Sequence, residues 1–133
     1  MKNRKENSPM EIYIHIPFCI RKCDYCDFLS GPSGPEEQAD YVQALLREIQ
    51  AVEEGEGRSV SSIFIGGGTP SVLDERLLGD ILREIRNRFK MEEDAEITIE
   101  VNPGTANIGK LQAYREMGIN RLSIGLQSPE DRE

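Results

Sequence analysis

Residues 12–28 read Ile-Tyr-Ile-His-Ile-Pro-Phe-Cys-Ile-Arg-Lys-Cys-Asp-Tyr-Cys-Asp-Phe, and they hold every cysteine of the 133-residue chain. From Glu11 to Ile16 polar and apolar residues alternate, with isoleucine at every second position, which predicts a β-strand. Pro17 ends that strand. A C-x3-C-x2-C cluster then follows, and three soft thiolates so close in sequence suggest a shared metal centre at Cys19, Cys23 and Cys26.

The composition is that of an acidic globular protein, with a formal net charge of −8, a pI near 4.8 and 38% hydrophobic residues. This length supports one domain with a real core. The acidic balance argues against sequence-independent nucleic-acid binding, which needs clustered Lys and Arg. The sequence has neither an apolar run of about 18 residues nor the apolar core of a secretion signal, so no membrane span and a cytoplasmic location are predicted. Residues 1–9 are expected to be a disordered leader, and residues 10–133 the domain.

Several kinds of centre could use these cysteines. An odd count within eight residues is a poor basis for a disulfide framework. Zinc normally takes four ligands, and His15 is the only histidine available as a fourth. An iron–sulfur cluster held by three cysteines would leave one iron open to a small molecule. Zinc and iron–sulfur readings both stay open on spacing alone, with the iron–sulfur reading favoured.

The remaining chain alternates between helix and strand patterns. Apolar residues at helical spacing predict helices at about 36–54, 74–90 and 107–117, and alternating residues predict further strands at about 61–65, 96–101 and 121–126. Pro35 is well placed as the first residue of the first helix. Ser71, with acidic residues after it, looks like the start of the second. The order β-α-β-α-β-α-β predicts a parallel sheet with right-handed crossovers.

The predicted strands have one apolar face and one polar face. The apolar set is expected to pack under the helices and comprises Ile12, Ile14, Ile16, Ile63, Ile65, Ile97, Ile99, Val101, Leu122, Ile124 and Leu126. The other face carries Tyr13, His15, Ser62, Phe64, Gly66, Thr98, Glu100, Asn102, Arg121, Ser123, Gly125 and Gln127. A barrel with a ligand-filled interior would suit that polar face, with chemistry at the carboxyl ends of the strands.

The length sets how much of a barrel this chain could form. Eight βα units take about 250 residues, or roughly 31 each, so this chain would supply about three and a half units. The predicted fold class is therefore α/β, a partial (incomplete) TIM-like β/α barrel that looks like the first half of a larger one. Its last strand would be left with an unpaired edge.

Four stretches carry a resemblance to a known family. The cysteine motif resembles the signature of radical S-adenosylmethionine (radical SAM) proteins. The runs Tyr13–Cys19, Gly66–Pro70, Glu100–Pro103 and Arg121–Ser128 resemble, in order, the oxygen-independent coproporphyrinogen III oxidase group. The resemblance covers Met10 to Ser128, but only the amino-terminal part of that group's length.

The resemblance implies a cofactor site. The three cysteines would hold a [4Fe-4S] cluster whose open iron chelates S-adenosylmethionine, and His15 would hydrogen-bond near the cluster rather than ligate it. The residues expected beside S-adenosylmethionine are Tyr13, Tyr25, Gly67, Gly68, Thr69, Glu100 and Gln127. Two plainer readings stay open: Gly66 to Gly68 as only a tight strand-to-helix turn, and Glu100 as a solvated residue.

One position separates two branches of the group. The porphyrinogen dehydrogenases carry a further cysteine two residues after the third, where this chain has Phe28. The run Cys-Asp-Tyr-Cys-Asp-Phe resembles instead the HemW-type branch of heme chaperones. The expected function is therefore a radical SAM heme chaperone, with heme as a further ligand. The alternatives are a porphyrinogen oxidase, a zinc-binding module and an inactive fragment that binds S-adenosylmethionine weakly. The heme-accepting protein and the electron donor are not indicated.

Overall fold

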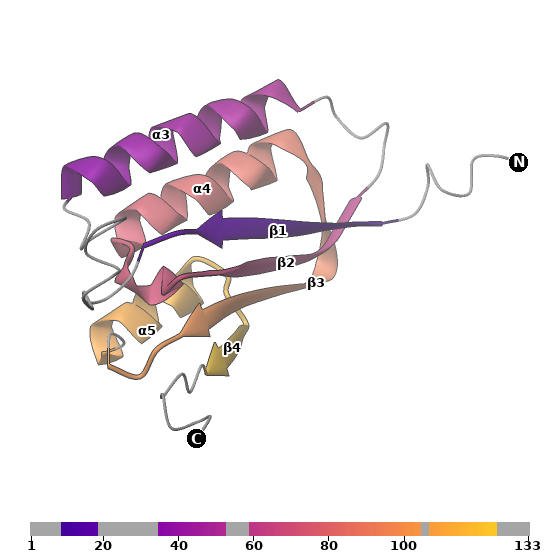
Figure 1. The fold of residues 1–133 in the computed structure, drawn as a ribbon. Coiled ribbons are helices and arrows are strands. Elements are labelled where there is room, and N and C mark those ends of the chain that lie inside the picture. The colour runs from indigo at the N-terminus through magenta and orange to yellow at the C-terminus, as the bar shows by residue number, and fades with distance from the viewer. Residues whose placement is uncertain (1–8, 19–34, 53–58, 105–106, 125–133) are drawn as a thin grey trace, which may run out of the picture.

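Four parallel strands form one sheet in this computed structural model, which describes residues 9–18, 35–52, 59–104 and 107–124. The strands lie in the order β1-β2-β3-β4 (Figure 1). The elements along the chain are β1 (Met10–Ile16), α3 (Pro35–Ala51), β2 (Ser59–Gly67), the 3₁₀ turn η1 (Pro70–Val72), α4 (Glu75–Arg88), β3 (Lys90–Val101), α5 (Ile108–Glu116) and β4 (Arg121–Ile124). The predicted alternation of strands and helices and the parallel sheet are confirmed, and a partial TIM-like barrel is consistent with them.

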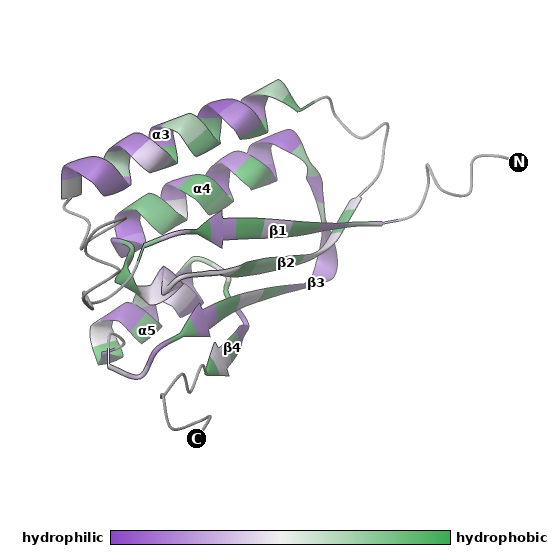
Figure 2. Ribbon diagram, viewed as in Figure 1, coloured by the Kyte–Doolittle hydropathy of each residue, from purple (hydrophilic) through white to green (hydrophobic). Residues whose placement is uncertain are grey.

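The apolar strand face packs against the helix layer, as the sequence predicts. Alternating residues of the first three strands are buried there together with the inner faces of the helices, and green bands alternate with purple or pale ones along the strands (Figure 2). The strand residues buried in this core are Ile14, Ile16, Val60, Ile63, Ile65, Ile97, Ile99 and Val101. The prediction is wrong for β4, where Leu122 and Ile124 share that face in register but are 43% and 56% exposed.

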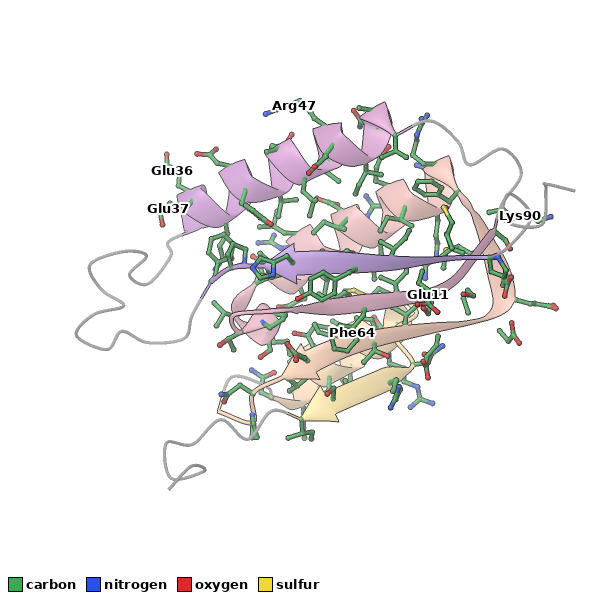
Figure 3. All side chains as sticks on the ribbon, turned by 45° about the vertical axis from the view of Figure 1, so that its right-hand side comes forward. Glu11, Glu36, Glu37, Arg47, Phe64 and Lys90 are labelled. Carbon is green, nitrogen blue, oxygen red and sulfur yellow. The ribbon has the colours of Figure 1, made fainter. Side chains whose placement is uncertain are left out.

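The opposite face carries the aromatic and polar side chains. Phe64 lies on the side of the sheet away from α3 and α4 (Figure 3), and Tyr13, its register partner on β1, is exposed. Thr98 is an exception to the expected exposure of this face, because it is buried between its register neighbours Phe64 and Arg121.

Two strands are longer than the sequence predicts. β2 extends through Gly66 and Gly67, because these glycines continue the pairing with β1. β3 begins at Lys90 rather than near residue 96, since Lys90 and Met91 pair with the start of β2 before an irregularity in the ladder. The acidic residues after Met91 have low strand propensity, so only the tertiary pairing makes this segment extended.

The helix ends follow local capping chemistry. α3 begins at Pro35, as predicted. Ser71, predicted as a helix start, lies instead in η1, and the N-cap of α4 is Asp74, whose Oδ1 accepts a hydrogen bond from the Arg76 amide at 2.9 Å. That backbone bond, reinforced by the Arg76 guanidinium, lowers the pKa of the Asp74 carboxyl. Asn107 caps α5 in the same way.

Candidate functional site

The glycine segment, Gly66 to Thr69, forms the end of β2 and the residues after it, and it lies directly against the end of β1. The Gly68 amide donates to the Ile16 carbonyl at 2.8 Å, and the Thr69 amide donates to the Phe18 carbonyl at 2.7 Å. A Cβ on Gly68 would lie 2.6 Å from the Phe18 carbonyl oxygen, so only glycine permits this approach. The segment is therefore a continuation of strand pairing, and the tight turn begins only at η1.

Gly67 needs glycine for two reasons. Its φ of +123° is one that residues with a side chain rarely adopt. A Cβ there would also lie 2.5 Å from the Ile16 carbonyl oxygen. Gly67 thus allows β2 to lie close to Ile16, just before the stretch from Cys19 to Cys26, called here the cysteine segment.

Gly66 forms the floor of a small cluster on the open face of the sheet. A Cβ at Gly66 would lie 2.9 Å from Cε2 of Phe64, 3.0 Å from Oε1 of Glu100 and 3.1 Å from the Tyr13 hydroxyl. These three side chains come from β2, β3 and β1 in turn. The missing side chain lets an aromatic ring, a carboxylate and a phenol meet over one backbone position.

Glu100 has a defined partner within this cluster. Its Oε1 accepts a hydrogen bond from the Gly67 amide at 3.2 Å, and its side chain is half-buried. Within the described residues its other oxygen makes no hydrogen bond or ion pair. Glu100 is therefore oriented by the neighbouring strand rather than freely solvated, with one carboxylate oxygen available to a ligand.

Tyr13 presents an exposed aromatic surface beside Glu100. Its side chain is 57% exposed and stacks on Phe64, with ring centroids 5.9 Å apart and an interplanar angle of 16°. The Tyr13 hydroxyl lies 3.4 Å from Nδ1 of His15, which occupies the same face. Phe64 was not among the predicted site residues, although the sequence already placed it on the polar face. Its register with Tyr13 is visible only in the fold.

The hydrogen-bond inventory of the glycine segment limits which ligand groups it can bind. The amides of Gly67, Gly68 and Thr69 all donate within the protein. What the segment retains for a ligand is the acceptor capacity of its carbonyl oxygens, each of which has two lone pairs. With the Glu100 carboxylate beside it, this set of acceptors fits an ammonium group, such as the amino end of an amino acid.

The predicted site residues divide into two groups. The structure brings Tyr13, Gly67 and Glu100 together at the carboxyl ends of the first three strands, with Gly68 and Thr69 alongside Phe18. The remaining predicted residues lie outside the described ranges, namely Cys19, Cys23, Tyr25, Cys26 and Gln127. In the described ranges no three His, Cys, Asp or Glu side chains gather as a metal site.

Phe18, the last described residue before Cys19, is held by the helix layer. It is buried, and its ring meets the Tyr41 ring of α3 edge-on, with centroids 5.4 Å apart at 79°. The described backbone up to Phe18 is thus held in place, and Phe18 lies against Gly68 and Thr69. Three thiolates with this spacing supply the donor set of an iron–sulfur cluster with one open iron.

Comparison with known proteins identifies the family. The model of the radical SAM superfamily matches residues 13–132. The chain belongs to the radical SAM superfamily.

Relatives of this radical SAM chain include heme chaperones. It is 47% identical over 122 residues to the heme chaperone HemW of Escherichia coli, which covers 90% of the chain and 32% of that protein. It is 40% identical over 129 residues to HemW of Haemophilus influenzae, covering 92% of the chain and 34% of the relative. The mitochondrial radical S-adenosyl methionine domain-containing protein 1 of Bos taurus is 39% identical over 124 residues, which cover 92% of this chain and 28% of that protein.

A solved structure has the same fold. The coproporphyrinogen III oxidase HemN of Escherichia coli, described as a radical SAM enzyme, superposes with a TM-score of 0.80 at 34% identity, covering 92% of this chain and 29% of that one. The radical SAM chain therefore spans about a third of the length of the relatives it matches. In the part of the chain that the structure describes, no helix is both long and apolar enough to cross a membrane.

Proposed function

We propose that this chain is the cluster- and S-adenosylmethionine-binding part of a radical SAM heme chaperone. The observation that carries the proposal is the meeting of Tyr13, Glu100 and the glycine segment at the carboxyl ends of β1 to β3, directly beside the residue that precedes Cys19. Carboxyl ends of parallel strands are where α/β barrels bind their ligands.

Each group in the site has a role that its chemistry suits. The Glu100 carboxylate and the carbonyls of Gly67 and Gly68 would accept hydrogen bonds from the ammonium of S-adenosylmethionine, and Tyr13 would offer its exposed ring to the rest of the molecule. Thr69, Tyr25 and Gln127 remain candidates for further contacts. Cys19, Cys23 and Cys26 would hold the cluster, which when bound supplies an electron to the sulfonium.

The branch of the family is argued from two observations on the sequence. The identity is 47% to a heme chaperone and 34% to the porphyrinogen oxidase structure. Phe28 also stands where the oxidases of the group have a further cysteine. Both observations support heme binding and transfer over porphyrinogen oxidation. The location that we propose is a reducing compartment such as the cytoplasm, because cluster ligands must stay reduced thiolates.

The cofactor proposal is tested by anaerobic reconstitution with iron and sulfide. We expect about four irons and four sulfides per chain, as a [4Fe-4S] cluster requires, and their loss on replacing any one of Cys19, Cys23 or Cys26 by alanine. Stoichiometric zinc without iron would refute this reading.

The S-adenosylmethionine site is tested by calorimetric titration of the reconstituted protein. We expect Glu100→Ala to weaken binding by roughly tenfold or more, as loss of a charge-assisted hydrogen bond should. Glu100→Gln keeps the acceptor oxygen for the Gly67 amide and serves as the matched control for structure. Unchanged affinity in Glu100→Ala would remove Glu100 from the site.

Porphyrinogen oxidation is the second candidate, favoured by the TM-score of 0.80 to the coproporphyrinogen oxidase. The two functions separate in one experiment on the natural protein that contains this sequence. We expect it to bind heme stoichiometrically, followed by its absorption spectrum, and to release no carbon dioxide from a porphyrinogen. Catalytic decarboxylation would favour the oxidase instead.

A further inference from the structure

The backbone that leads into the cysteine segment is held from two sides. On the β2 side, the carbonyls of Ile16 and Phe18 accept from the amides of Gly68 and Thr69. In a parallel ladder alternate residues direct their amide and carbonyl to the same neighbour, so the His15 carbonyl points away from β2. β1 is an edge strand of the sheet as described, and that carbonyl needs another donor.

Tyr41 supplies this donor from α3. Its hydroxyl donates to the His15 carbonyl at 2.5 Å, and its ring packs edge-on against Phe18. One side chain therefore contacts residues on both sides of Pro17. Burial, with Glu48 and Tyr13 nearby, raises the pKa of Tyr41, so the phenol stays protonated and keeps donating at neutral pH.

We propose that Tyr41 is a positioning residue for the cluster, acting through the backbone of His15 to Phe18 to set where Cys19 begins. The idea rests on the proposed function, because it assumes that Cys19 is a cluster ligand. Sequence pattern alone assigns Tyr41 only to the apolar face of a helix. The contact to His15 lies 26 residues away along the chain and is visible only in the fold.

The same geometry connects Tyr41 to the open face of the sheet. The His15 carbonyl accepts the hydrogen bond from Tyr41. On the open face, Nδ1 of the His15 ring lies 3.4 Å from the Tyr13 hydroxyl. A change in the His15 peptide would therefore move the Tyr13 side of the cofactor site as well as the start of the cysteine segment. Tyr41 itself belongs to the helix layer.

Tyr41→Phe tests the hydroxyl while keeping the ring against Phe18. Tyr114→Phe is the matched control, because Tyr114 is another helical tyrosine, fully buried where Tyr41 is partly buried, and its hydroxyl has no hydrogen-bond partner in the described part of the chain. Both variants are reconstituted anaerobically, and three quantities are compared with the wild type: irons bound, the electron paramagnetic resonance spectrum of the reduced cluster, and the rate of cluster loss in air.

We expect Tyr41→Phe to fold and bind iron, but to show an altered resonance spectrum and a cluster lost about two- to tenfold faster, the change that one hydrogen bond would give. Amide exchange at Gly68 and Thr69 should rise by a similar factor, since their acceptors lie on the segment that Tyr41 holds. Tyr114→Phe should match the wild type in all of these.

The outcomes separate this proposal from the proposed function. A wild-type chain that binds no cluster overturns both. A wild-type cluster with an unchanged spectrum and loss rate in Tyr41→Phe overturns the positioning role alone. Equal effects in Tyr41→Phe and Tyr114→Phe would show general loosening of the helix layer, which also overturns it.

Discussion

Replacing Gly67 by alanine should destabilise this fold far more than the same change at two other glycines. Gly67 combines a φ of +123° with a would-be Cβ 2.5 Å from the Ile16 carbonyl oxygen. The backbone strain costs about 1–3 kcal/mol. Overpacking against a backbone atom that cannot rotate away costs roughly another 1–3 kcal/mol. Alanine also lowers the conformational entropy of the unfolded chain, which offsets about 0.4–1 kcal/mol of this destabilisation.

The net loss is therefore about 1–5.5 kcal/mol, with a middle value of about 3 kcal/mol, a large part of the ~5–15 kcal/mol that stabilises an ordinary domain. For a domain of this size each kcal/mol lowers the melting temperature by roughly 3–5 °C. At the middle value of about 3 kcal/mol, we expect Gly67→Ala to melt about 10–15 °C below the wild type, measured by far-ultraviolet circular dichroism with urea unfolding as the second assay.

Two matched variants make the comparison specific. Gly79, within α4, has only the terminal methyl of Met117 near its would-be Cβ, at 3.8 Å, so Gly79→Ala should stabilise the helix by about 0.5–1 kcal/mol. Gly66→Ala meets the ends of three side chains that can rotate, so it should change stability by less than about 1.5 kcal/mol while displacing Glu100 and Tyr13. A Gly67→Ala melting temperature equal to that of Gly66→Ala would refute the argument from φ and close approach.

Three further changes test other contacts. Asp74→Ala should cost about 1 kcal/mol of stability by removing the α4 cap. Because the folded-state pKa of Asp74 is lowered, the wild type should be more stable than Asp74→Asn above the ordinary pKa of an aspartate, and this difference should be lost as the pH falls through the folded-state pKa. Urea unfolding between pH 7 and pH 3 would follow the difference. Tyr114→Phe should leave stability unchanged or raise it by about 1 kcal/mol, since the hydroxyl is buried without a partner among the described residues. Burial raises the pKa of Tyr114, so above about pH 10, where the unfolded tyrosine ionises, urea unfolding should show the wild type losing more stability than Tyr114→Phe. Asn120→Ala should cost about 2 kcal/mol, because its side chain accepts from the Ile97 amide and donates to the Ala95 carbonyl, and a cost near zero in urea unfolding would contradict that role.

The sequence predicted the parts of this fold that depend on periodicity. Isoleucines at every second position identified β1, and the burial of Ile14 and Ile16 confirms which face is inward. The parallel order followed from the alternation of strands and helices. The extension of β3 back to Lys90 could not be predicted, because the acidic residues after Met91 have low strand propensity and the pairing of Lys90 and Met91 with Ser59 and Val60 is a tertiary contact.

The site was predicted less completely than the fold. Placing Tyr13 and Glu100 on one face needed only the alternation within strands, and the structure brings them together at Gly66. Phe64 shared that face but is apolar, so it gave no chemical signal by itself. Tyr41 could not have been found from sequence, since its hydroxyl contact depends on how α3 crosses the edge of β1. The cofactor roles of the predicted residues stay predictions.

The pairing of Ile16 and Phe18 with Gly68 and Thr69 has a consequence for how the protein is made. The cysteine segment leaves the ribosome first, and the glycines that fix its starting point emerge about fifty residues later. At roughly 5–20 residues per second, the nascent chain spends about 3–10 seconds with its thiolates exposed before β2 can align them. A cluster delivered during that interval would meet ligands whose starting point is not yet fixed, so we expect cluster assembly to follow the emergence of β2 and its pairing with β1.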